Sequence, residues 1–147
     1  MESACRRALP ADAAVCVAAV SDWRPDAVFG VKLKKAHAGP PSVTLVENPD
    51  ILAGLAAAGP DRPRLVVGFA AETNDLEAHA RSKLKRKGCD WIVANDVGAG
   101  AVMGGDENEV LLIDASGEER WPKSGKAEIA RRLAARIAAA LSAGAGV

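Results

Sequence analysis

Two lysines of the predicted helix at residues 75–87 have a spacing that suits binding of a polyphosphate. Lys83 and Lys87 are four residues apart, so they lie one helical turn apart on the same face. Two ammonium groups in this arrangement could hold a triphosphate. The same charges also suit the end of a helix, because cations in the last turn offset the negative end of the helix dipole. The pattern alone favours this second interpretation and leaves the first open.

A second basic group is the KLKK run at residues 32–35. In an extended segment, alternation would place Lys32 and Lys34 on one side and Leu33 and Lys35 on the other. A lysine beside a reacting group could supply positive charge. Edge strands also carry lysine merely to prevent pairing with other chains, and the pattern alone favours that role.

The segment Asn48-Pro49-Asp50 predicts the start of a short helix that extends to about Ala58. Asn48 is a favourable N-cap, and Pro49 at the first helical position loses no hydrogen bond. The N–H groups at such a start can bind an anion or the edge of a base, although most helix starts bind only water.

Polar residues also follow the apolar runs that predict buried strands. Asp22 comes directly after the first run, where a carboxylate could bind a metal-phosphate group or a ribose hydroxyl, or simply cap a turn. The strand ends at residues 18–22, 69–73 and 95–96 are expected to meet at one rim, because ligands of parallel sheets bind beyond the carboxyl ends of the strands. Glu72, Asn95 and Asp96 lie near this rim, and no role is assigned to them.

Strands and helices alternate along the chain, which predicts an α/β fold: a mostly parallel sheet flanked by helices. A protruding two-stranded arm is predicted at about residues 23–46, and a hairpin near the C-terminus. The strands are expected at 13–20, 64–70, 91–94, 109–114 and 118–121, the arm pieces at 28–35 and 42–46, and the helices at 2–9, 49–58, 75–87 and 124–141.

Length and composition indicate a single α/β domain over residues 1–147. Nineteen basic and nineteen acidic residues cancel, so we expect no nucleic acid partner and no membrane partner. The sequence shows no signal peptide or membrane span, which predicts a cytoplasmic protein. The three cysteines are far apart and lack metal-binding spacing, so a zinc site or disulfide is disfavoured.

The well-known nucleotide fingerprints are missing. Neither GxGxxG after a strand nor GxxxxGK[ST] occurs, which argues against an NAD(P)-linked oxidoreductase and a P-loop enzyme. Ser21, His37 and His79 lack the context of a hydrolase triad.

Six motifs follow one another in an order that is far more specific than any one of them. They are AAVSDWRP, KLKK, VENPDIL, VVGFAAET, ARSKLKRKGCDWIVAND and DENEV, and they span about residues 11–137. In this order the chain resembles the phosphopantothenate-cysteine ligases. The resemblance implies a Rossmann-like fold and a homodimer formed through the arm. It also implies a reaction of coenzyme A synthesis, in which phosphopantothenate and cysteine are the substrates and CTP with Mg²⁺ activates the carboxylate.

The resemblance also implies roles for individual residues. Lys32 corresponds to the catalytic lysine of the family's arm, which offers charge to an acyl-cytidylate intermediate or its leaving group. Metal ligands are not identified, and no flavin is expected in this chain. The CTP contacts would carry over to Cys16, Val17, Ala18, Asp22, Lys32, Pro49, Asp50, Ile51, Leu52, Phe69, Lys83 and Lys87.

The sequence departs from the family pattern at its beginning, because the opening strand, the Gly-rich turn and the NxSSG-type segment are absent. We therefore expect weak CTP binding at best and no ligation by this chain alone. We also expect an unpaired sheet edge or an exposed apolar face, with dimerisation or aggregation. An alternative is a non-catalytic nucleotide-binding and dimerisation module that needs a separate partner segment.

Overall fold

The chain forms two compact units in a computed structural model that describes residues 1–28, 30, 42–72, 75–96 and 107–144. The first, which we call the sheet unit, comprises Met1–Val17 and Ile51–Val147. The second, the arm unit, is Ala18–Asp50. Each unit is described by itself below.

A five-stranded sheet forms the centre of the sheet unit, in the order β1-β4-β5-β6-β7. Its strands are β1 (Ala13–Cys16), β4 (Leu65–Glu72), β5 (Trp91–Asp96), β6 (Glu107–Ile113) and β7 (Glu118–Gly125). Only β6 opposes the direction of the others, since β1, β4 and β5 are parallel and β7 is antiparallel to β6. The mixed, mostly parallel sheet and its C-terminal hairpin β6–β7 confirm the predicted α/β fold.

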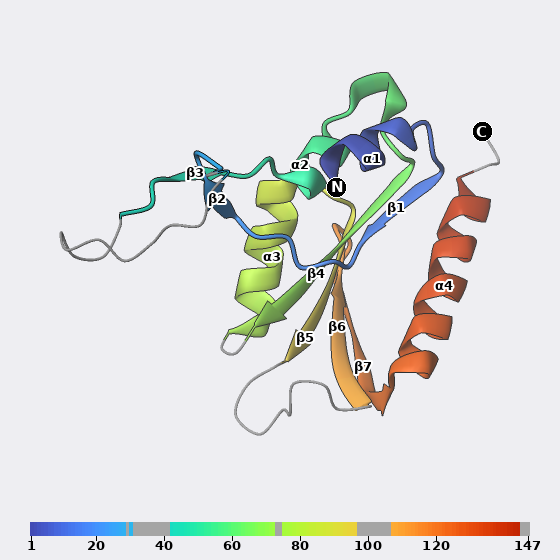
Figure 1. Ribbon diagram of the computed structural model, residues 1–147. Helices are drawn as coiled ribbons and strands as arrows, with labels where there is room; N and C mark the ends of the chain where they lie inside the picture. Colours follow the sequence, from blue (N-terminus) through green and yellow to red (C-terminus); the bar gives the residue numbers. More distant parts are fainter. Residues whose placement is uncertain (29, 31–41, 73–74, 97–106, 145–147) are drawn as a thin grey trace. The chain divides into compact units, whose positions relative to one another are not determined.

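Helices cover both faces of this sheet, as Figure 1 shows, with α4 (Lys126–Ala143) on one face and α2 (Ile51–Ala56) and α3 (Leu76–Lys87) on the other. The helix α1 (Glu2–Arg7) packs against α2, and a 3₁₀ turn, Gly59–Asp61, follows α2. We call the two sides of the sheet the α4 face and the α2/α3 face.

The α4 face is filled by alternate side chains of the strands, among them Val67, Val93 and Leu112. Leu133 is buried among them, and Ile129, Ile137 and Leu141 pack at the margin. These four helix residues recur every fourth position, so their stripe predicted from the sequence is confirmed.

The α2/α3 face is filled by the intervening strand side chains, including Val66, Ile92 and Leu111. Ala80 of α3 is completely buried here, and Leu76 and Leu84 pack beside it. The predicted stripe of α3 is confirmed too, and so is the glycine at its end, because Gly88 has a φ of 64°.

Aromatic and charged side chains tie α4 to the edge of the sheet. Arg132 lies 4.7 Å above the ring centre of Trp121, and its guanidinium donates to Glu119 at 2.7 Å. Arg136 forms an ion pair with Glu119 at 2.7 Å and another with Asp114 at 3.5 Å. Hydrogen bonding from Arg132 is the main reason that the pKa of Glu119 is lowered.

One ion pair fastens the starting ends of β4 and β5. Arg62 donates to both carboxylate oxygens of Asp90 at 3.0 Å and to the carbonyl oxygen of Ala56 at 2.9 Å. One oxygen of Asp90 also accepts the backbone N–H of Val66 at 2.6 Å. The Arg62–Asp90 clasp therefore connects the last residue of α2 to both central strands.

The arm unit contains a two-stranded antiparallel sheet of β2 (Trp23–Pro25) and β3 (Leu45–Glu47). A further backbone bond joins Asp26 N–H to the carbonyl oxygen of Thr44 at 3.0 Å. The predicted pair of arm strands is confirmed, and β3 overlaps the predicted piece at 42–46. The first strand, β2, comes before the predicted piece at 28–35, of which residues 29 and 31–35 lie outside the described residues.

Asn48 does not begin the following helix, which starts at Ile51. Its side chain instead donates to the carbonyl oxygen of Ser21 at 2.7 Å and accepts from Arg24 at 3.1 Å. Its backbone N–H donates to the carbonyl oxygen of Asp22 at 2.8 Å. The predicted N-cap role of Asn48 is therefore wrong, because hydrogen bonds within the arm unit occupy its amide group.

None of the helices in the described ranges has the length and apolar character needed to cross a membrane.

Candidate functional site

The carboxyl ends of the two central strands lie side by side, as the topology predicted for these two of its three strand ends. The third predicted end, residues 18–22, belongs to the arm unit, because β1 ends at Cys16. Parallel pairing matches Glu72 of β4 with Asp96 of β5, and Cys16 at the end of β1 with Gly68. Thr73 and the Gly-rich segment at 97–105 lie outside the described residues. The rim is therefore formed by β4 and β5, with β1 ending four residues earlier along β4.

Several of the predicted ligand residues gather on the α2/α3 face. Leu52 of α2 packs against the core of this face, directly over Gly68. Cys16 is the strand partner of Gly68, so its side chain lies on the same face. Lys83 and Lys87 are half-buried in α3, which packs on this face beside α2. Three separate elements thus bring their candidate residues to one side of the sheet.

The two thiols of this face are protonated at neutral pH. Burial raises the pKa of the Cys16 thiol, and its neighbour Cys5 raises it further. Burial is also the main cause of the raised pKa of Cys89, and the ammonium group of Lys83 partly opposes it. Because a thiol rather than a thiolate is present, these side chains offer apolar contact and not nucleophilic attack.

Phe69 lies on the other side of the sheet. It follows Gly68 in β4, and its ring packs against the core of the α4 face. Alternation along a strand causes this separation, because neighbouring side chains point to opposite faces. The sheet therefore separates the ring of Phe69 from Lys83, and the predicted residues divide between the two faces.

The remaining predicted residues flank or occupy the arm unit. Val17 is 60% exposed at the end of the first segment of the sheet unit. Ala18, Asp22, Pro49 and Asp50 belong to the arm unit and are exposed. Lys32, the predicted catalytic residue, lies outside the described residues.

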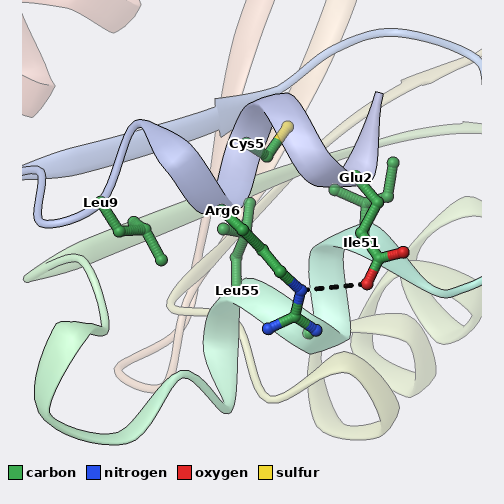
Figure 2. Close-up of a pocket in the computed structure, with 7 residues that line it drawn as sticks. Glu2, Cys5, Arg6, Leu9, Ile51 and Leu55 are labelled. Carbon is green, nitrogen blue, oxygen red and sulfur yellow. Dashed lines mark hydrogen bonds and ion pairs between the residues drawn. The ribbon is translucent and has the colours of Figure 1, made fainter.

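Two hollows occur in the sheet unit away from the strand ends. Figure 2 shows the first, where α1 lies over α2 and Arg6 is bonded to Glu2 at 3.0 Å. It holds only about 10 Å³, so α1 packs closely against Leu55 and its neighbours. The second is an open depression of about 720 Å³ where β5 begins, beside the β6–β7 turn. It is lined by Arg81, Leu84, Lys85, Gly88, Cys89, Asp90, Trp91, Asp114, Ala115 and Ser116.

The sequence reasoning assigned nothing to two residues that position the α2/α3 face. Arg62 holds the end of α2, and Gly68 accommodates Leu52 near its start. An arginine just before a strand carries no specific signal in the sequence. A glycine inside an apolar strand does, because it often marks the close approach of another element.

In the described parts of the chain, no three histidine, cysteine or acidic side chains are grouped so that they could hold a metal ion.

The family model described as "DNA/pantothenate metabolism flavoprotein C-terminal domain" matches residues 1–141. The chain belongs to this family. It is 42% identical over 144 residues to the coenzyme A biosynthesis bifunctional protein CoaBC of Mycobacterium tuberculosis strain H37Rv, covering 92% of this chain and 34% of that protein. CoaBC of Vibrio vulnificus strain CMCP6 is 39% identical over 128 residues, covering 86% of this chain and 32% of the relative.

Solved structures agree with this assignment. The crystal structure of the C-terminal domain of CoaBC has a TM-score of 0.66 and 31% identity, covering 89% of this chain and 55% of that chain. The flavoprotein from Streptococcus pneumoniae has a TM-score of 0.62, with 92% of this chain and 64% of that chain covered. At 22% identity, the latter supports the fold alone. The family predicted from the six motifs is confirmed, and the chain spans about a third of the length of its curated relatives.

Proposed function

We propose that this chain supplies the nucleotide-handling part of a phosphopantothenate-cysteine ligase in coenzyme A synthesis. In the reaction, the phosphopantothenate carboxylate attacks the α-phosphorus of CTP, which releases pyrophosphate and leaves an acyl cytidylate. The amine of cysteine then attacks the acyl carbon, CMP leaves with the bonding electrons, and an amide forms.

The observation that carries this proposal is the gathering of Cys16, Leu52 and Lys83 on the α2/α3 face. Leu52 and the neutral thiol of Cys16 offer an apolar wall to a base or sugar. Lys83 and Lys87 offer positive charge to phosphates from half-buried positions, where water screens the attraction less than at the surface. An apolar wall and a pair of ammonium groups on one side of the sheet would match the two halves of a nucleotide.

The arm unit contributes the catalytic charge in this proposal. Lys32 would approach the acyl cytidylate and stabilise the negative charge that develops on the leaving group. Closure of the arm would also keep water from a reactive acyl phosphate. We propose in addition that the arm joins two copies of the chain in a cytoplasmic homodimer.

Mg²⁺ belongs to the same proposal, as an ion that arrives with CTP. Magnesium usually binds substrate phosphates and keeps several waters, so it needs few protein ligands. When bound, it would neutralise charge on the departing pyrophosphate. Lys83 and Lys87 would neutralise the remaining phosphate charge.

Titration calorimetry with CTP and Mg²⁺ tests the nucleotide site. Lys83→Ala should weaken CTP binding by about tenfold or more, since a hydrogen bond to a charged group contributes about 1.5–3 kcal/mol. Lys85→Ala is the matched control, because its exposed side chain is two residues away along α3 and leaves the helix on another side. Equal effects of both variants would contradict a site on the α2/α3 face.

Turnover tests the role of the arm and separates catalysis from assembly. The assay follows CMP release from CTP, phosphopantothenate and cysteine after the chain has been reconstituted with the opening segment of a relative's ligase domain. Lys32→Ala should abolish CMP release while the mass of the assembly stays the same. An altered mass with normal release would instead favour a non-catalytic dimerisation module.

A further inference from the structure

Gly68 occupies an unusual position for a glycine, in the middle of the central strand β4. It pairs with Cys16 on one side and Ile92 on the other. Glycine weakens the interior of a strand, so its presence usually marks a place that another group approaches closely. Its neighbours Val66 and Ala70 belong to the core of the α2/α3 face, and position 68 therefore points to that face.

The group that approaches is the side chain of Leu52. A Cβ atom placed on Gly68 would lie 2.5 Å from one terminal methyl of Leu52 and 3.4 Å from the other. It would also lie 2.9 Å from the terminal methyl of Ile92, which is completely buried. Two side chains would have to move for a single added methyl group, and the close-packed core leaves Ile92 little freedom. Leu52 can therefore occupy its position only because residue 68 has no side chain.

Another constraint on α2 is at its other end. Arg62 donates to the carbonyl oxygen of Ala56, the last residue of this helix, and Arg62 is itself held by Asp90. Leu52 is the second residue of the same helix. With the far end held, a methyl group at position 68 would push the side chain of Leu52, at the beginning of α2, away from β4. Cys16 would stay in place, because it belongs to β1.

We propose that Gly68 is a positioning residue for the nucleotide. It sets the distance between Leu52 on α2 and Cys16 on β1, the two apolar walls that would receive the base or sugar. This inference rests on the proposed function, since it assumes that CTP binds on the α2/α3 face. Gly68 does not touch the nucleotide itself, and it acts through the placement of Leu52.

The test compares Gly68→Ala in β4 with Gly54→Ala in α2, a matched substitution of another glycine. Gly54 lies in α2, and an added Cβ there would be 3.6 Å from Arg6, which is ordinary contact. Amide hydrogen exchange of residues 51–56, measured without nucleotide, reports the seating of α2. Gly68→Ala should accelerate this exchange at least tenfold and leave β6 unchanged, whereas Gly54→Ala should leave α2 protected.

CTP affinity is then measured by calorimetry on the same proteins. Gly68→Ala should raise the dissociation constant at least tenfold, and Gly54→Ala should change it less than twofold. Adding Leu52→Val to Gly68→Ala removes the two colliding methyl groups of Leu52 and leaves that of Ile92. The double variant should therefore recover an affinity within about threefold of Leu52→Val alone, which a general loss of stability would not produce.

The results of these experiments distinguish the positioning role of Gly68 from the proposed binding of CTP. Unchanged exchange in α2 would overturn the positioning role whatever the affinity, and so would faster exchange with unchanged affinity. Failure of the double variant to recover affinity would overturn it as well. Absence of CTP binding by the unmodified chain, even after reconstitution with the opening segment of a relative, would overturn the proposed function, and with it the inference. Amide exchange would still report whether Gly68 positions α2. If Gly68→Ala does not fold, the comparison of the double variant with Leu52→Val decides the matter.

Discussion

Different forces stabilise the interior of the sheet unit and that of the arm unit. In the sheet unit, strand side chains such as Val66, Ile92 and Leu111 are completely buried between helices. In the arm unit, the described side chains are exposed apart from the half-buried Val46 and Asn48, and backbone and amide hydrogen bonds hold the two short strands. The comparison teaches that apolar burial, and with it most of the stability, is concentrated in the sheet unit.

The largest effect is expected when one apolar side chain in each unit is shortened to alanine and the losses of stability are compared. Ile92→Ala should lower the free energy of unfolding by about 2–5 kcal/mol, because it leaves a cavity between the sheet and α3. Val46→Ala should cost about 1 kcal/mol or less, since Val46 is only half-buried in a strand of three residues. Urea unfolding followed by circular dichroism measures both. Similar losses would mean that the arm unit also has an apolar core.

Acid should act on the sheet unit through Asp114 and Glu119. Burial raises the pKa of Asp114, but hydrogen bonds from Ser116 and Gly117 outweigh it, so the pKa is lowered. The pKa of Glu119 is lowered by Arg132 and Arg136. A carboxylate with a lowered folded-state pKa stabilises the protein above its unfolded pKa, and that contribution is lost as pH falls through the folded pKa.

The unfolding temperature should therefore decrease as pH falls from about 5 towards 3, because unfolded carboxylates titrate near 4. Glu119→Gln should lower the unfolding temperature at pH 7 and flatten its dependence on pH. Differential scanning calorimetry between pH 3 and 7 provides the measurement. A variant as sensitive to acid as the original chain would show that Glu119 does not contribute.

The smallest effect on global stability is expected from Asn48→Ala in the arm unit. The change removes the side-chain bonds to Ser21 and from Arg24, each contributing about 1 kcal/mol locally. Exchange of the backbone N–H groups of Asp26 and Asn48 should become roughly five times faster or more, while the urea midpoint stays unchanged. Amides of β6 in the same sample serve as the control. A shift of the urea midpoint would show that the arm unit and the sheet unit unfold together.

Periodicity predicted the parts of the fold that pack on the sheet. The four-residue spacing of Leu76, Ala80 and Leu84 gave the buried stripe of α3, and Gly88 gave its end. The same reasoning failed at Asn48, where a good N-cap residue is instead engaged by Arg24 and Ser21. That contact joins residues 24 positions apart, so no local rule for helix starts could anticipate it.

The candidate site was predictable to a smaller extent. The motifs led to the family, and topology placed the ends of β4 and β5 together. The continuous apolar runs of these strands concealed which face each residue occupies, so the separation of Phe69 from Lys83 appears only in the structure. The seating of Leu52 over Gly68 also depends on how closely a helix approaches a strand, which no spacing within the sequence encodes.

The Arg62–Asp90 clasp lies where β4 and β5 begin, at the opposite end of the sheet from the rim where they finish. The two central strands are thus anchored at the pole opposite their carboxyl ends. A substitution at Glu72 or Asp96, the last residues of these strands, lies at the far end of its strand from this anchor and leaves its partners in place. Side chains at the rim can therefore differ without loss of the contact that holds the two strands at their beginnings.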